Sequence, residues 1–202
     1  MLLYDYWRSS AAYRVRIALN LKGLQAEQRA PAYREVNPQA LVPTLVVGER
    51  RIAQSLAIIE YLEERHPLPP LLPPGAEDRA WVRSIALAIA CDIHPLDNLR
   101  VLNYLIGTMG VSREQKDGWY RYWIDVGFEA LEKMLAADAA TGRFCHGDAP
   151  TLADICLVPQ MANARRFSID LSPYPTLMRI ESACNALPAF AAAAPARQPD
   201  AE

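Results

Sequence analysis

A proline-dense segment divides the chain into two parts of different character. It reads HPLPPLLPPGAED and covers residues 66–78. Proline lacks a backbone N–H and fixes its own φ angle, so this segment cannot continue a helix and keeps the chain extended. We therefore expect one domain at residues 1–70 and another at residues 76–202. The 202 residues suffice for one large domain or two small ones.

Before the proline-dense segment, short β-like runs alternate with helical patterns. We expect strands at residues 2–4, 26–30, 44–47 and 51–53. A helix is expected from Ser9 or Ser10 to Gly23, because serine caps a helix and glycine ends one. A second is expected over residues 55–65, with its glutamates on the solvent face. These elements predict a small sheet covered by helices.

After the proline-dense segment the pattern is helical throughout. Helices are expected at residues 79–106, with a kink at Pro95, and at 112–137, 151–166 and 175–187. Thr151 and Asp154 have the spacing of a capping box, which marks a helix start. The Ala/Pro-rich tail after Phe190 is expected to fray. The predicted fold class is α+β, with the sheet confined to the first domain.

Charge and cysteine usage limit the classes of partner. The 21 basic and 23 acidic residues nearly balance, which gives no electrostatic reason to expect nucleic acid or an anionic membrane. The longest apolar run, near residues 85–91, is too short to cross a membrane, and no leader segment is visible, so we expect a cytoplasmic protein. The four cysteines are widely spaced and favour buried thiols outside any disulfide. The three histidines supply no zinc-site grouping, so no metal is expected.

Two features of the first part could bind a ligand near one another. Ser9 and Ser10 stand at a helix start, where unpaired N–H groups and the helix dipole favour an anion. Pro43 directly precedes a strand, and a proline there is often cis and leaves the backbone of Val42 available to an extended ligand. Each feature alone is more simply explained as an ordinary cap or turn.

A third feature is the start of the second helix. Gln54 and Ser55 open it and could hold a carboxylate on N–H groups and a hydroxyl. Alone, Ser55 is most simply another helix cap. The order of the three features along the chain, however, favours two anion sites flanking a strand edge.

Several segments together resemble one known family. They are SSAAYRVRIALNLKGL, NPQALVPTL, QSLAIIEYLEERHP, CDIHPLDN, TLADICLVPQ and FSIDLSPYP, and they span nearly the whole chain. This set is similar to the zeta class of the glutathione transferase superfamily, which includes bacterial maleylpyruvate and maleylacetoacetate isomerases. The resemblance implies a thioredoxin-like N-terminal domain, an all-helical C-terminal domain, a homodimer, and glutathione bound between the domains.

The resemblance also implies roles for individual residues. Val42 would pair with the cysteinyl backbone of glutathione, and Gln54 and Ser55 would hold its γ-glutamyl end. His94 and Asn98 would contact it from the helical domain, although His94 taken alone is more simply a core histidine. The cofactor-binding set is completed by Ser9 and Ser10. The Ser9 hydroxyl would face the sulfur and stabilise a thiolate supplied by the ligand.

The implied reaction is cis–trans isomerisation of a conjugated diacid in the catabolism of aromatic compounds such as gentisate, homogentisate and tyrosine. A thiolate adds to the double bond, the bond rotates, and elimination restores the thiol. The protein must supply cations for the carboxylates and for the enolate. Arg8 and Arg166 are our candidates beside Ser9, because the guanidinium fork binds a carboxylate at two points.

The other arginines have different expected roles. Arg165 and Arg100 are held in reserve, whereas Arg14 and Arg16 are expected to form surface or interdomain salt bridges. Two departures from the family pattern affect the site. Ala11 stands where zeta members commonly carry a cysteine, so a mixed disulfide cannot form there. The connection at residues 29–38 resembles a shortened form of a segment that usually forms a helix beside glutathione, which leaves contacts from that region open.

Two other functions fit the same residues. The fold could act as a glutathione transferase or dehalogenase on small α-halo acids, since the same thiolate and arginines would serve displacement. It could also be a non-catalytic glutathione-fold module that acts through a surface. Conjugation depletes free glutathione whereas isomerisation does not, and a binding module would be retained on glutathione without turning over either diacid.

Overall fold

The chain forms two compact units. The computed structural model describes residues 1–30 and 33–201. The first unit contains residues 1–73 together with the chain from Cys184 onward, and the second contains Pro74–Ala183. The change at residues 73–74 falls inside the proline-dense segment. A second change at Cys184 returns the chain to the first unit, which no feature of the sequence announces.

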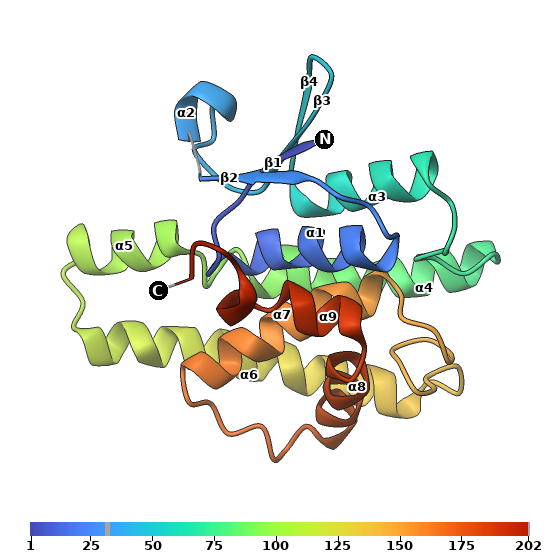
Figure 1. The fold of residues 1–202 in the computed structure, drawn as a ribbon. Coiled ribbons are helices and arrows are strands. Elements are labelled where there is room, and N and C mark those ends of the chain that lie inside the picture. Colours follow the sequence, from blue (N-terminus) through green and yellow to red (C-terminus); the bar gives the residue numbers. More distant parts are fainter. Residues whose placement is uncertain (31–32, 202) are drawn as a thin grey trace. The chain divides into compact units, whose positions relative to one another are not determined.

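A four-stranded sheet lies in the first unit (Figure 1). Its strands are β1 (Leu2–Tyr4), β2 (Glu27–Arg29), β3 (Thr44–Val47) and β4 (Arg50–Ala53), in the order β2-β1-β3-β4. β1 pairs in parallel with β2 and antiparallel with β3, which forms a hairpin with β4. Leu3 and its cross-strand partner Leu45 are fully buried, so the centre of the sheet lies in the core.

The first unit contains two helices that the sequence pattern predicts and a short one that it does not. They are α1 (Ser10–Leu21), the short α2 (Tyr33–Val36) and α3 (Ser55–Arg65). α1 begins after Ser9 and stops before Gly23, whose φ of +64° suits glycine. α2 lies in the shortened connection, of which residues 31–32 fall outside the described chain.

One glutamate of α3 departs from the expected solvent face. Glu63 is buried, and its carboxylate forms an ion pair of 2.7 Å with the ammonium of Lys22. Both of its oxygens also accept from the Leu71 backbone N–H. The prediction for Glu63 was wrong because its partners come from α1 and from the proline-dense segment, which helix periodicity does not report.

The expectation of a frayed tail was also wrong. After Cys184 the chain forms α9 (Pro188–Ala193) and the 3-10 turn η2 (Pro195–Arg197). α9 packs along α1, and Phe190 and Ala193 are buried. Buried side chains and the hydrogen bond from Arg16 to the Ala193 carbonyl thus order a segment whose composition alone suggests disorder.

The second unit is entirely helical. It contains α4 (Ala76–Leu87), the π-helical turn η1 (Ala88–Ile93), α5 (Leu99–Gly107), α6 (Arg113–Ala137), α7 (Leu152–Arg166) and most of α8 (Pro175–Asn185). α7 is buried along most of its length and packs against α4. The expected capping box at Thr151 and Asp154 is confirmed, with Asp154 Oδ2 accepting from the Thr151 N–H at 2.7 Å.

The expected long helix with a kink at Pro95 is instead two helices. α4 ends in η1, and a new helix begins at Leu99 with Asn98 as its cap. α4 also starts earlier than expected, after Gly75, inside the proline-dense segment. Pro95 therefore lies in the turn between two helices, where its missing N–H breaks no helical hydrogen bond.

The four cysteines differ in burial. Cys145, Cys156 and Cys184 are buried as expected, but Cys91 is exposed on η1.

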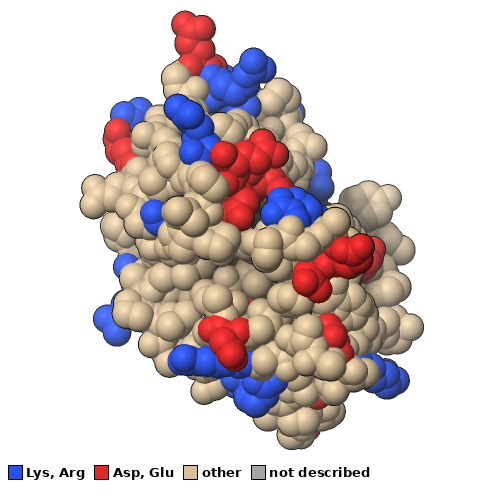
Figure 2. Space-filling view, turned by 90° about the vertical axis from the view of Figure 1, so that its right-hand side faces the viewer, with Lys and Arg blue, Asp and Glu red and all other residues tan. Residues whose placement is uncertain are grey.

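Within residues 1–30 and 33–201, no group of His, Cys, Asp or Glu side chains is arranged to hold a metal ion. Among the described residues, no helix combines the length and apolar character needed to cross a membrane. Figure 2 shows acidic and basic side chains mixed over one face.

Candidate ligand-binding site

Ser9 lies at the junction between β1 and α1. Its N–H donates to the Tyr6 carbonyl at 2.9 Å, and its Oγ accepts from the Ala12 N–H at 3.2 Å. A hydroxyl can accept and donate at once, so this cap leaves the hydrogen of Ser9 available to a ligand. The half-buried Oγ at a helix N-terminus is therefore suited to a bound anion.

The two neighbours of Ser9 differ in environment. Ser10 is buried as the first residue of α1, so it is less accessible to a ligand than Ser9. Arg8 is exposed, and its guanidinium carbon lies 4.4 Å from the ring centre of Trp7. This cation–π contact limits the directions that the Arg8 side chain can take.

The main chain before β3 is ordered by a side chain that the sequence analysis overlooked. The Val42–Pro43 peptide bond is cis, as expected. Asn37 is buried, and its Nδ2 donates to the Leu41 carbonyl at 2.9 Å. Its Oδ1 accepts from the Gln39 N–H at 3.0 Å. Asn37 thus fixes the turn that leads into Val42, and the signal for it was the Asn-Pro pair.

Gln54 adopts an unusual backbone conformation at the start of α3. Its φ of +72° lies in the left-handed region, which a residue with a side chain adopts only when its surroundings impose it. Its side-chain Nε2 donates to Gln39 Oε1 at 3.1 Å. Such outliers gather at ligand sites, so the conformation is consistent with a role for Gln54 in binding.

Ser55 accepts a hydrogen bond from a buried cation on α1. Arg14 is only 1% exposed, and its Nη1 donates to Ser55 Oγ at 3.4 Å. The expectation of a surface position for Arg14 was wrong, because its side chain is buried and runs from α1 to the start of α3. A buried positive charge there adds to the attraction that the helix N-terminus has for an anion.

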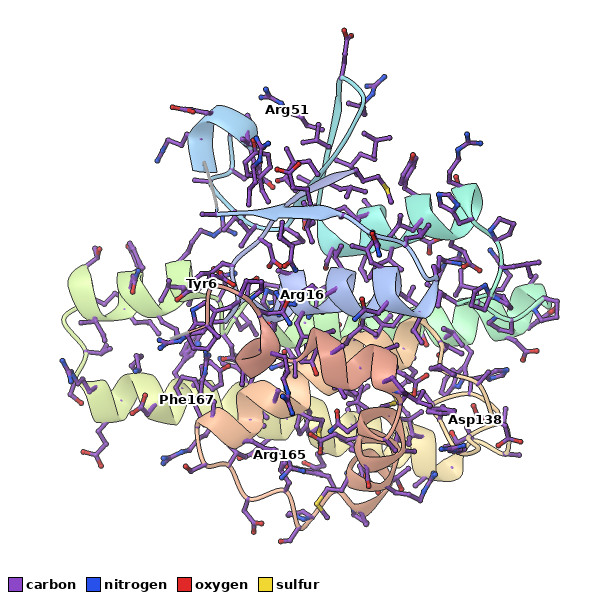
Figure 3. All side chains as sticks on the ribbon, in the orientation of Figure 1. Tyr6, Arg16, Arg51, Asp138, Arg165 and Phe167 are labelled. Carbon is purple, nitrogen blue, oxygen red and sulfur yellow. The ribbon has the colours of Figure 1, made fainter. Side chains whose placement is uncertain are left out.

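Arg16, which is labelled on α1 in Figure 3, is likewise buried, at 3% exposure. Its guanidinium forms an ion pair with Asp5, with Nη1 at 2.7 Å from Oδ1. Asp5 belongs to the first unit. The Ala193 carbonyl, which accepts from Arg16 Nε, belongs to the same unit. The expectation of a surface or interdomain salt bridge was therefore wrong for Arg16.

The second unit carries the other predicted cofactor residues. His94 is half-buried directly after η1, and its N–H donates to the Ile89 carbonyl at 2.9 Å. Asn98 caps α5, with Oδ1 accepting from the Arg100 N–H at 3.0 Å. Arg100 itself is exposed. His94 and Asn98 thus lie on one turn, between η1 and α5.

The two arginines at the end of α7 have different environments. Arg165 forms an ion pair with the buried carboxylate of Glu181, and its Nε donates to Glu181 Oε1 at 3.1 Å. This hydrogen bond raises the pKa of Arg165. Arg166 is exposed, and its guanidinium carbon lies 5.2 Å from the ring centre of Phe167. Arg165 has a structural partner, which favours Arg166 as the cation for a ligand.

The buried phenol of Tyr120 lies near Arg166 and near the buried acid Asp97. Asp97 is buried, and neither carboxylate oxygen has a hydrogen-bond partner among the described residues. Burial raises the pKa of Asp97 to about 8. Burial also raises the pKa of Tyr120 to about 12, with Asp97 adding to the shift and Arg166 opposing it. The Tyr120 phenol thus interacts with the charges of both Asp97 and Arg166, which no sequence motif indicated.

A groove of about 380 Å³ lies elsewhere in the first unit. Its lining includes Arg16, Gln28, Ala193 and Gln198, from α1, β2 and the C-terminal segment. None of the predicted site residues lines it. The groove therefore marks the contact of the C-terminal segment with α1 and β2, not the surroundings of Ser9.

Comparison with known proteins gives consistent matches. Residues 3–70 match the family model of the glutathione S-transferase N-terminal domain. A probable maleylacetoacetate isomerase of Vibrio cholerae is 51% identical, with 100% of this chain and 98% of the relative covered. A maleylpyruvate isomerase of Ralstonia sp is 48% identical, with 99% of each covered.

Solved structures match over the same length. The holo structure of a maleylpyruvate isomerase, described as a bacterial zeta-class glutathione S-transferase, superposes with a TM-score of 0.98 at 48% identity and covers both chains fully. A maleylacetoacetate isomerase of Methylobacterium extorquens AM1, solved with bound malonate and glutathione, gives a TM-score of 0.97 at 43% identity, again with both chains fully covered. These matches confirm the expected thioredoxin-like and all-helical parts.

Proposed function

Because the chain belongs to the zeta class of the glutathione transferases, together with the maleylacetoacetate and maleylpyruvate isomerases, we propose that it is a glutathione-dependent cis–trans isomerase of one of these diacids. The main support for this proposal is about 50% sequence identity, over the full length, to relatives with these names. The reaction belongs to the catabolism of aromatic compounds. Ser9 at the start of α1 supplies the position from which a thiolate can be stabilised.

The residues of the first unit fit glutathione. Ser55, with the Arg14 cation behind it, suits the carboxylate of the γ-glutamyl end, and Gln54 stands beside it. The Val42 main chain, in the turn that Asn37 orders, suits pairing with the cysteinyl backbone. The bound tripeptide would supply a thiolate that adds to the cis double bond, permits rotation and is then eliminated. Ser9 would donate its hydroxyl hydrogen to that sulfur.

We assign the diacid carboxylates to Arg8 and Arg166. Both are exposed, and each guanidinium is held against an aromatic ring, Trp7 for Arg8 and Phe167 for Arg166. A cation that is already oriented loses less conformational entropy when it binds a carboxylate. Arg100 is exposed and stays in reserve, whereas Arg165 is occupied by Glu181.

The remaining parts of the proposal concern organisation. Residues 1–70 would form the glutathione-binding domain, and residues 76–202 would complete the substrate site with His94 and Asn98. The substrate would be a small dicarboxylate, the protein a homodimer, and its compartment the cytoplasm. A bound malonate in the related Methylobacterium extorquens structure supports a dicarboxylate, because malonate carries two carboxylates.

A spectrophotometric assay on both diacids, with and without glutathione, tests the function. We expect isomerisation of at least one diacid that requires glutathione, while the concentration of free glutathione stays constant. Depletion of glutathione in step with product would instead indicate a transferase or dehalogenase. Retention on immobilised glutathione without turnover of either diacid would contradict an isomerase and favour a binding module.

A further inference from the structure

The C-terminal segment, residues 188–200, is hydrogen-bonded to the loop that carries Arg8 and Ser9. The carboxylate of Asp200 accepts from the Trp7 N–H at 3.1 Å. On the other side of the same residue, the Trp7 carbonyl accepts from Arg16 Nη2 at 3.1 Å. The N–H and C=O of Trp7 are thus held by two side chains from opposite ends of the chain.

Arg16 connects this loop to the rest of the C-terminal segment. Its Nε donates to the Ala193 carbonyl at 3.0 Å, and its Nη1 binds both oxygens of Asp5. The Asp5 carboxylate also accepts from Gln28, which in turn donates to Gln198 at 3.2 Å. A buried guanidinium with a hydrogen bond on each of its three nitrogens is restricted in orientation, which also restricts the Trp7 carbonyl that it contacts.

The Gln198 side chain extends the same network inside the C-terminal segment. Its Nε2 donates to the carbonyls of Ala192 and Ala194, at 3.0 and 2.9 Å. Gln198 is buried, and it follows the turn η2 directly. These bonds hold the end of the segment against α9, which brings Asp200 to the Trp7 N–H.

Trp7 connects the hydrogen-bonded loop to the Arg8 side chain. The Arg8 guanidinium lies over the Trp7 ring at 4.4 Å from its centre, and Arg8 is exposed. An exposed arginine normally samples many rotamers and loses that freedom when it binds a carboxylate. The Trp7 backbone is held on both sides, and the face of its ring reduces the number of orientations open to the cation.

We propose that the C-terminal segment positions the substrate cation. Asp200 and Arg16 fix the Trp7 backbone, and the Trp7 ring orients the Arg8 guanidinium toward a carboxylate of the diacid. Trp7 and Asp200 are positioning residues, since neither needs to touch the substrate. The role of Arg8 in this inference rests on the proposed function, whereas the ordering of the loop by Asp200 does not.

Amide hydrogen exchange of Trp7, followed by NMR without any ligand, tests the first step. Asp200→Ala removes the acceptor, and we expect the Trp7 amide to exchange at least fivefold faster. Asp200→Asn keeps an acceptor oxygen and should stay within twofold of the wild-type rate. Glu49→Ala removes the same charge from an exposed turn and serves as the matched control. Unchanged exchange in Asp200→Ala would overturn the proposal.

The second step is tested at Trp7. In Trp7→Leu, the Arg8 side-chain Nε–H signal should lose its ring-current shift, and KM for the diacid should rise at least fivefold. KM for glutathione and kcat should stay within twofold. Trp7→Phe keeps a ring face and should restore most of the diacid KM. Equal changes in both KM values would mean a general structural effect, which would refute positioning of Arg8.

These measurements separate the two proposals. If the wild-type protein isomerises neither diacid, the proposed function fails. The inference about the loop then depends on the Trp7 exchange rate and the Arg8 signal, which need no substrate. If the wild type is active and both NMR readouts are unaffected by their variants, the positioning role fails and the function stands.

Discussion

At the scale of single residues, Ser9 combines a structural and a chemical task in one hydroxyl. Its Oγ accepts from the Ala12 N–H, and its hydrogen can still be donated. Ser9→Ala should lower the free energy of unfolding by about 1 kcal/mol, as loss of an N-cap does. It should lower kcat on the order of 100-fold, because a donor to the reacting sulfur is lost. Chemical denaturation and steady-state kinetics measure the two effects.

The control for Ser9 is another serine cap. Ser112 caps α6 and accepts from the Gln115 N–H at 3.1 Å, in a capping box. Ser112→Ala should cause a similar loss of stability with kcat unchanged. Glutathione affinity, measured by calorimetry, should fall much less than kcat in Ser9→Ala. Equal losses in affinity and turnover would count against a role of Ser9 on the thiolate.

Arg165 and Arg166 form a matched pair for a second prediction. Arg166→Ala should raise KM for the diacid at least tenfold, roughly 1.4 kcal/mol of binding, and leave glutathione affinity unchanged. Arg165→Ala removes the partner of the buried Glu181, so it should lower the free energy of unfolding without changing that KM. Kinetics with both substrates and a denaturation curve for each variant test this. Unchanged diacid kinetics in Arg166→Ala would remove Arg166 from the site.

At the scale of elements, the turn between η1 and α5 contains the buried acid Asp97. Its pKa is about 8 in the folded protein, because burial disfavours the charged form, and about 3.9 in an unfolded chain. Between these two pH values, Asp97 is protonated in the folded protein but ionised in the unfolded chain. The contribution of Asp97 to stability is therefore fully present below pH 4, falls as pH rises toward 8, and is level above that.

Asp97→Asn should remove this pH dependence. The variant and the wild type should have similar stability near pH 4, and the variant should gain relative to the wild type as pH rises. The gain should be at most about 1.4 kcal/mol per pH unit up to pH 8. Urea denaturation at pH 5, 7 and 8.5 measures the difference. A constant difference across these pH values would mean that Asp97 is ionised throughout.

Elements with a local signal were predictable from sequence. The strands Leu2–Tyr4 and Thr44–Val47 and the helix Ser55–Arg65 have the expected bounds, because short apolar runs, caps and apolar periodicity are local properties. Arg14 and Arg16 were misplaced because helix periodicity treats arginine as polar. Whether a guanidinium is buried depends on a partner such as Asp5, which lies on a different element.

In the candidate site, too, contacts between different elements were not predictable from the sequence. The sequence pointed to Ser9, Val42, Gln54 and Ser55 through caps, a proline and a family resemblance. It did not point to Asn37 or Arg14, which support these residues from the side, since each acts through a contact that only the folded chain creates. Residues that orient a site leave a weaker local pattern than those at helix starts.

At the scale of the whole molecule, the C-terminal segment belongs to the first unit. Phe190 is fully buried on α9, which packs along α1, and Asn20 on α1 donates to the Ala189 carbonyl at 2.9 Å. The sequence could not predict this, because α9 is one short helix with a single large apolar side chain. A composition rich in alanine and proline is equally typical of a disordered tail.

Phe190→Ala tests whether the segment is part of the core of the first unit. The change removes a fully buried ring, and we expect the free energy of unfolding to fall by about 3 to 5 kcal/mol. Ala191→Ser alters the exposed neighbour on the same helix and should change it by less than about 1 kcal/mol. Guanidinium denaturation followed by circular dichroism compares the two variants. A loss below about 1 kcal/mol in Phe190→Ala would mean that the ring contributes little to the core, because a frayed tail has no buried contact to lose.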